Sequence, residues 1–295
     1  MSYQIRSISF PARSSHHPII LRIESELNKL RSWQHDHLEA ASSSTVAESV
    51  FFSLSRLEEL HDCMDEILRL QSTQQTLSKP QHSSFVDSLL DASLKLLDVC
   101  TSSRDAMLVI KERVQDLQAA MRRRRLQADS SPEMILSNYI CFRKRMKKDA
   151  KRYMALLKQI EAELEGSLLP QHPDHQLLSL MRAVKDVILA NTSIFESLLV
   201  FVSAQESKTK KAASKWSLAA RFMTKDNNKC VSNEFAALDA ELCRVGKGTI
   251  IMSGSEIQSM MNGVEMIVDG MESSLERVFR CLIKTRASFL NIRSH

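Results

Sequence analysis

The segment VGKGT at positions 245–249 is the stretch of the chain that most resembles a phosphate-binding loop. Such a loop follows a strand, cradles phosphate with the N–H groups of a glycine-rich turn, and ends in Lys followed by Ser or Thr. The pattern would require glycine at position 241, which is glutamate, and serine or threonine at position 248, which is glycine. No strand pattern precedes the segment, so the sequence does not predict nucleotide binding there.

The histidine spacings do not predict a metal site. His35 and His37 would lie about 200° apart around a helix, so they cannot bind one ion together. His172 and His175 are close enough in a loop to chelate, but no cluster of further ligands completes a zinc site. We therefore expect no metal, no cofactor and no catalytic residue. An enzyme is the class of protein that the sequence supports least.

The six cysteines stand singly, without a CxxC pair. They are Cys63, Cys100, Cys141, Cys230, Cys243 and Cys281. The sequence also lacks a secretory signal pattern, so we expect free thiols in a reducing compartment. Cysteines on apolar stripes, such as Cys100, are expected to be unreactive core residues.

Basic clusters carry the clearest binding chemistry in the sequence. Four arginines, Arg122 to Arg125, directly follow an apolar repeat. They could form a nucleic-acid or nuclear-import tract, or the charged last turn of a helix, where cations meet the partial negative charge of unpaired carbonyls. We favour the helix end, with its charges pointing into solvent, although a solvated basic run can serve both roles.

Two further basic segments follow. Residues 143–152 hold seven basic residues and one acid, and the apolar stripe of a helix continues through them. Residues 205–229 hold seven basic and two acidic residues around Trp216. We favour a linker packed on the bundle for this segment, over a helix that docks on a membrane surface or a partner. The candidate contacts for a protein partner or an anionic lipid surface are Arg122, Arg123, Arg124, Arg125, Arg143, Lys144, Lys147, Lys148, Lys151 and Trp216.

Long helices must position these clusters. Six glycines and 5% aromatic residues among 295 residues disfavour sheets, whose turns use glycine and whose strands favour aromatic side chains. Apolar residues instead recur at helical spacing in six segments separated by short connections. We predict an all-α fold, an elongated antiparallel bundle of five to six long helices around one continuous core. The segment CTSSRD at 100–105 is expected to kink or break its helix.

The expected organisation is a disordered N-terminal tail over 1–17 and a single helical domain over 18–295, with a basic linker at about 205–232. The tail is rich in arginine and serine and lacks acids, as in an organelle transit peptide. We find no run approaching the ~20 apolar residues that span a bilayer, so we do not expect an integral membrane protein. We expect a cytoplasmic protein that can associate with membranes, with the plastid as the second choice.

The short link at 126–131 predicts that the helices on either side are antiparallel neighbours. The two basic clusters would then lie along one end of the bundle. An acidic helix face at 58–66 is expected to neutralise part of their charge.

Seven sequence blocks resemble one plant family in composition and order. They are RSISFPARSSHHP, LHDCMDEIL, VDSLLDASLKLLDVC, KERVQDLQAAMRRRR, RKRMKKDAKR, SKWSLAARFM and LERVFRCLIKTRASFLNI. Together they look like the BYPASS-like proteins of plants, long described as a domain of unknown function, and they span nearly the whole chain. The resemblance implies a role in root and shoot development, where the founding member restrains a root-derived mobile signal that arrests the shoot. It implies no established activity or ligand, and therefore no catalytic residues.

We therefore expect a non-enzymatic helical regulator or scaffold that acts by binding another protein. The alternative is a peripheral protein that binds anionic membranes through its polybasic segments, since each Lys or Arg near such a surface contributes about 1 kcal/mol. Nucleic acid is the least expected partner, because few aromatic residues are interleaved with the basic ones.

Overall fold

The computed structural model describes residues 17–39, 45–126, 132–166, 175–204, 233–246 and 254–294. These ranges form eight α-helices and one short 3-10 helix, and none of them contains a strand. The helices are α1 (Pro18–Glu39), α2 (Val46–Leu68), α3 (Gln71–Leu77), η1 (Pro80–His82), α4 (Ser83–Leu126), α5 (Pro132–Gly166), α6 (His175–Ser203), α7 (Glu234–Gly246) and α8 (Gly254–Ser294). The predicted all-α fold, a bundle of five to six long helices, is confirmed. Residues 1–16 of the predicted tail and the whole predicted basic linker lie outside the described residues.

Local sequence signals set where these helices begin. Thr45 caps α2, because its side chain accepts the Glu48 N–H at 3.3 Å and the Glu48 carboxylate accepts the Thr45 N–H at 3.0 Å. This reciprocal pair is a capping box. At the start of α7, the Asn233 side chain accepts the Ala236 N–H at 3.0 Å. Polar side chains thus satisfy N–H groups that the first turn of a helix leaves unpaired.

The long helix α4 does not have the break that is one of the two alternatives expected at 100–105. It is unbroken through the segment at 100–105. Ser103 is buried, and its hydroxyl donates to the Val99 carbonyl at 2.8 Å, one turn earlier. The hydroxyl therefore bonds within the helix instead of competing with the helical backbone.

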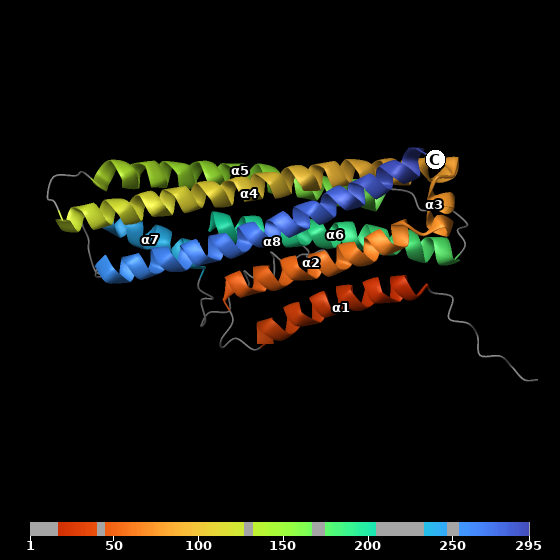
Figure 1. Ribbon diagram of the computed structural model, residues 1–295, viewed down its shortest axis with the longest axis horizontal. Coiled ribbons are helices and arrows are strands. Elements are labelled where there is room, and N and C mark those ends of the chain that lie inside the picture. Colours follow the sequence, from red (N-terminus) through yellow and green to blue (C-terminus); the bar gives the residue numbers. More distant parts are fainter. Residues whose placement is uncertain are drawn as a thin grey trace, which may run out of the picture.

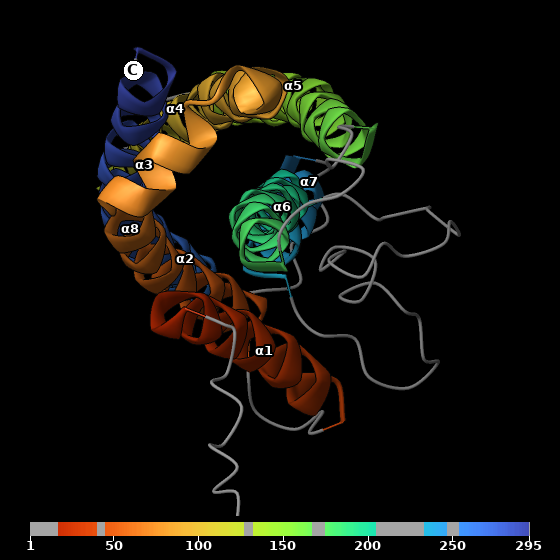
Figure 2. The same ribbon diagram turned by 90° about the vertical axis from the view of Figure 1, so that its right-hand side faces the viewer.

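Five helices form a curved layer in the spatial order α1, α2, α8, α4 and α5, and α6 lies in the concave side of this layer (Figures 1 and 2). α8 therefore lies between α2 and α4, although it comes last in the chain. Contacts fix the helix directions, because Asp87 pairs with Arg293 while Arg104 pairs with Glu276, so α4 and α8 are antiparallel. The other neighbours in the layer are also antiparallel, except that α2 and α8 run in the same direction (Figure 1).

Most residues of helix α6 are buried, and the helix contacts α1, α2, α4, α5 and α7. By length and composition alone it could cross a membrane, but 89% of its most apolar window is buried inside the structure. The expectation that no segment approaches spanning length is therefore wrong for α6. A helix that is apolar on all sides suits either the centre of a large core or a membrane.

A polar cluster connects α2, α6 and α8 inside the core. Asn191 donates its side-chain N–H to the Val187 carbonyl at 2.8 Å, so its carbonyl oxygen faces Nε2 of His61 at 3.0 Å. Nε2 must therefore carry the imidazole proton, and Nδ1 accepts the Thr285 hydroxyl at 2.9 Å. Burial lowers the pKa of His61 below its ordinary value, while the hydrogen bond to Asn191 opposes this shift.

Candidate functional site

Helix α5 positions the second basic cluster, and its helical period divides the cluster into two faces. Tyr139, Arg143, Met146 and Ala150 follow one another at spacings of four, three and four residues, and all four are buried. Residues at this spacing share one face of a helix. Arg143 therefore points inward, while the lysines around it lie on the other faces.

Arg143 is held by a buried ion pair between α5 and α7. Its Nε lies 2.8 Å from Oδ1 of Asp239 and its Nη2 lies 2.9 Å from Oδ2, a bidentate arrangement. Nη1 donates to the Val202 carbonyl of α6 at 2.8 Å, and the guanidinium lies 5.5 Å from the Phe235 ring centre. Tyr139 also donates to Asp239, at 2.9 Å. Arg143 thus connects three helices.

This placement corrects the prediction that Arg143 contacts a partner or lipid. Only 4% of the residue is exposed, so its guanidinium has no access to another molecule. The reason is the apolar stripe, in which Arg143 replaces an apolar residue and obtains its own carboxylate partner. The same burial, with the nearby Asp239 charge, raises the pKa of Tyr139 above its ordinary value.

The basic surface of α5 consists of Lys144, Lys147, Lys148 and Lys151. Lys144, Lys148 and Lys151 are exposed at spacings of four and three residues, so they form one row along the helix. In the described part of the chain, none of these three has a carboxylate within ion-pair distance. Lys147 differs, since its side chain is 41% exposed and its Nζ lies 3.8 Å from Asp239. The row of three therefore presents uncompensated positive charge on the described surface.

The arginines at the end of α4 are exposed where the structure describes them. Arg122 and Arg123 lie in the last turns of α4, which ends at Leu126. Arg122 donates to the Gln118 carbonyl at 3.3 Å. The prediction of a solvent-facing helix end is confirmed for these two residues. The side chains of Arg124 and Arg125, and the whole of Trp216, lie outside the described residues.

The predicted antiparallel pairing of α4 and α5 is confirmed, and the end of α4 lies near the start of α5 (Figure 1). The predicted neutralisation of the basic clusters by the acidic face of α2 is not confirmed. Glu58 pairs with Arg277 of α8 at 2.7 Å, and Glu66 pairs with Arg22 of α1 at 2.9 Å. These carboxylates therefore serve the packing of α1, α2 and α8, far from the basic surface along the curved layer.

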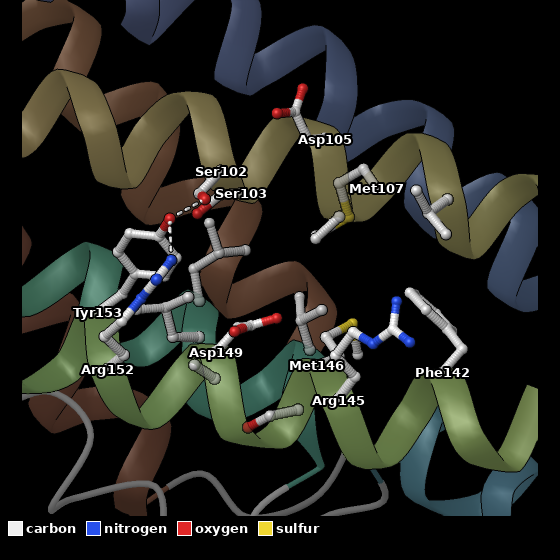
Figure 3. Close-up of a pocket in the computed structure, with 17 residues that line it drawn as sticks. Ser102, Ser103, Asp105, Met107, Phe142, Arg145, Met146, Asp149, Arg152 and Tyr153 are labelled. Carbon is white, nitrogen blue, oxygen red and sulfur yellow. Dashed lines mark hydrogen bonds between the residues drawn. The ribbon is translucent and has the colours of Figure 1, made fainter.

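A cleft of about 220 Å³ opens between α4 and α5 and reaches down to α6 (Figure 3). Its apolar wall contains Ala106, Met107, Val109, Phe142, Met146, Ala150, Leu198, Leu199 and Val202. Its polar lining consists of the buried Ser103 and Ser203 and of a rim that contains Ser102, Asp105, Arg145, Asp149, Arg152 and Tyr153. The cleft therefore joins an apolar interior to a rim that carries both signs of charge.

One part of the rim is tied together by hydrogen bonds across the two helices. The Ser102 hydroxyl on α4 donates to the Tyr153 hydroxyl on α5, and Nη2 of Arg152 donates to the same oxygen at 2.8 Å (Figure 3). The Arg152 guanidinium also lies over the Tyr153 ring, 4.7 Å from its centre. Sequence reasoning missed this cluster, because Ser102 and Tyr153 are brought together only by the packing of α4 on α5.

Other candidate chemistry is absent from the described ranges. No group of three or more His, Cys, Asp or Glu side chains there could hold a metal ion. His175 is exposed, whereas His172 and the side chains of His35 and His37 lie outside the description. Cys100 is free and buried, and burial raises the pKa of its thiol to about 12. A thiol with such a pKa is an unreactive core group at neutral pH.

Comparison with known proteins gives one family. A family model described as Protein BPS1 matches residues 53–292, a range that extends from α2 almost to the end of α8. Neither the curated proteins nor the solved structures contain a match to this chain.

Proposed function

The chain belongs to the Protein BPS1 family, and from this premise we propose that it is a non-enzymatic regulator or scaffold in root and shoot development. Membership supports a role in plant development and agrees with the likeness to the BYPASS-like proteins. We further propose that the chain acts by binding an acidic segment of another protein on the basic surface of α5.

The observation that carries the proposal is the row formed by Lys144, Lys148 and Lys151. These lysines are exposed and have no carboxylate partner in the described part of the chain. The apolar packing of α5 uses its opposite face, so the fold does not require charge in this row. Like charges one turn apart on a helix repel and weaken the helix slightly. A partner that supplies carboxylates removes this repulsion and gains charge-assisted contacts.

The spacing of the row also limits the form of the partner. From Lys144 to Lys151 the helix rises about 10 Å, at 1.5 Å per residue. A helical segment with Asp or Glu at the same spacings of four and three residues can meet all three ammonium groups. Complementary charges of this kind mainly increase the association rate and the specificity.

An anionic membrane is the second candidate, because the same lysines would be attracted to it at about 1 kcal/mol each. The described surface of α5 argues for protein first. Its one large, well-exposed apolar side chain is Met134, near the start of the helix and more than two turns before Lys144. Membrane-surface helices usually insert an apolar face below their basic residues, and the row of lysines has none.

The test compares two triple variants with the same change in net charge. The first is Lys144→Gln, Lys148→Gln and Lys151→Gln. The second replaces the exposed and dispersed residues Lys79, Lys158 and Lys284 by Gln. Quantitative affinity capture from root and shoot tissue, followed by titration of each purified captured protein at low and high salt, measures partner binding. Co-sedimentation with liposomes, with and without anionic lipid, measures membrane binding.

We expect the row variant to lose at least about tenfold in affinity for its partner, since three exposed pairs together contribute roughly 1.4 kcal/mol. The dispersed variant should bind like the natural sequence. Equal binding by both variants would contradict the proposal. Loss of anionic-liposome binding with unchanged protein capture would instead assign the surface to membranes.

A further inference from the structure

The cleft between α4, α5 and α6 contains a cation that the fold does not use. Arg145 rises from α5 between Phe142 and Met146 toward α4 (Figure 3). It is exposed at the rim and forms no hydrogen bond or ion pair with the described residues. Arg152, at the other end of the rim, is already bound to Tyr153. Arg145 is therefore the cation that is free to bind a molecule entering the cleft.

The acidic residues of the rim are placed differently. Asp105 points away from the cavity, whereas Asp149 points toward it from α5 (Figure 3). Asp149 therefore offsets part of the positive charge that faces the cavity. Lys144, Lys148 and Lys151 lie on the opposite face of the same helix, so the positive potential that faces the cavity comes from the arginines of its rim. Low-dielectric walls concentrate such a potential within a cleft.

We propose that this cleft binds a small amphipathic anion, a molecule with one carboxylate or similar group on a compact apolar body. The anionic group would lie against Arg145, and the apolar body would contact Met107, Met146 and Leu198. An apolar wall with a few converging polar groups is the usual composition of a small-ligand site. This site is separate from the protein-binding row and does not depend on the function proposed above.

The size of the cleft limits the ligand. A cavity of roughly 150 Å³ holds benzene, so one of about 220 Å³ holds a body of one or two fused rings. A ligand of this size is expected to bind with a Kd on the order of 0.1–1 mM. Larger ligands would have to extend out of the mouth of the cleft.

The probe for the test is 2-naphthoate, and its uncharged amide, 2-naphthamide, is the matched control ligand. Methionine methyl NMR on the full chain locates the bound probe, because Met107 and Met146 line the cleft and Met266 is exposed on α8. Substitution of each methionine by leucine assigns its signal. We expect saturable shifts at Met107 and Met146, and none at Met266.

Three variants separate the contributions of the Arg145 charge, the Asp149 charge and the open volume of the cleft to ligand binding. Arg145→Gln should weaken naphthoate about tenfold and leave naphthamide unchanged, because one charge-assisted contact is lost. Asp149→Asn should strengthen naphthoate, since it removes the carboxylate that faces the cavity. Ala106→Met should fill the cleft and abolish the binding of both probes, with a circular dichroism melt to show that the variant is folded.

Lys148→Gln is the control for diffuse electrostatics, since Lys148 is exposed on α5 outside the cleft. It should change naphthoate binding less than about twofold, as an exposed charge that the ligand does not contact. Equal weakening by Lys148→Gln and Arg145→Gln would overturn the proposal. So would shifts that appear first at Met266, or no shift at Met107 and Met146 at several times the expected Kd. None of these outcomes would alter the test of the lysine row, which measures protein capture.

Discussion

Arg143 and Lys148 lie less than two turns apart on α5 and carry the same charge, but their surroundings are opposite. Arg143 is buried and bound by Asp239, by the Val202 carbonyl and by the Phe235 ring. Lys148 is exposed, and the described residues give it no ion-pair partner. One basic block in the sequence thus contains a residue that the fold requires and residues that it does not.

The seam between α4 and α8 provides a second contrast with the outer face of α5. Its cations are matched with acceptors on the neighbouring helix. The pairs are Arg104 with Glu276, Lys111 with Asp269, Arg293 with Asp87, and Arg286 with the Leu90 carbonyl and the Ser93 hydroxyl. In this seam, the cations of each helix are therefore bound by acceptors on the helix packed against it. The row of Lys144, Lys148 and Lys151 on α5 has no such acceptor among the described residues.

The largest expected effect is at the inner face of α5. Arg143→Met should lower the free energy of unfolding by about 3 kcal/mol, because it leaves the Asp239 carboxylate without its main partner in a mostly buried position. Lys148→Met, on the outer face, should change it by less than about 0.5 kcal/mol. Urea unfolding measures both variants. Similar losses of unfolding free energy in the two variants would contradict the proposed difference between the inner and outer faces of α5.

A substitution in the seam between α4 and α8 should lower the free energy of unfolding less than Arg143→Met on the inner face of α5. Arg286→Gln removes donors to the Leu90 carbonyl at 2.6 Å and to the Ser93 hydroxyl at 3.0 Å, both partly buried. We expect a loss of about 1.5 kcal/mol, typical of hydrogen bonds from a charged group. Arg280→Gln is the control, since the Arg280 side chain is 70% exposed and its ion pair with Glu276 lies within α8. A lower melting temperature for Arg280→Gln than for Arg286→Gln would contradict this order.

A pH titration extends the comparison to an interior group that must remain neutral. Burial lowers the pKa of His61 in the folded state, so between that pKa and about 6.5 the unfolded chain binds more protons than the folded one. The free energy of unfolding should therefore fall as the pH is lowered below about 6.5, by up to about 1.4 kcal/mol per pH unit.

The measurement is the difference between the natural chain and His61→Gln across this pH range, because other groups titrate in both proteins. The variant is expected to be less stable at pH 7.5, where it lacks the imidazole contacts with Asn191 and Thr285, and to lose less on acidification. If the free energy of unfolding depended on pH in the same way for both proteins, His61 would not change its protonation when the chain unfolds.

The smallest effect on stability is expected at the exposed clusters. Replacing Lys144, Lys148 and Lys151 by Gln, or Arg122 to Arg125 by Gln, should leave the melting temperature within a few degrees of the natural value. We predict that both changes weaken partner or lipid contact instead. A large fall in melting temperature for the arginine variant would show that Arg124 and Arg125 are bound to carboxylates.

The elements of the fold could be predicted from the sequence because each long helix repeats its apolar residues over many turns. Pro18 starts α1, Thr45 caps α2 and Pro132 starts α5, as helix-start residues do. The apolar stripe of α5 could also have revealed Arg143, which lies on it between Tyr139 and Met146. Seven basic residues in ten positions concealed that one of them faces the core.

The neighbours of each helix could not be predicted in the same way. Every long helix except α6 has an apolar stripe at helical spacing, and nothing local to α2 or α4 indicates that α8 packs between them. The acidic face of α2 was therefore assigned to the wrong cations. The cleft depends on how far α4 and α5 separate above α6, which is a property of their packing and leaves no local signal.

The position of α8 between α2 and α4 has a consequence for the order of assembly during synthesis. The apolar stripes of α2 and α4 leave the ribosome early, but the helix that covers both is made last among the described elements. At roughly 5–20 residues per second, synthesis from the end of α4 to the end of α8 lasts on the order of 10–30 s. Throughout this interval the apolar stripes of α2 and α4 lack the helix that covers both in the folded protein, and such exposed apolar surface makes a nascent chain prone to aggregation.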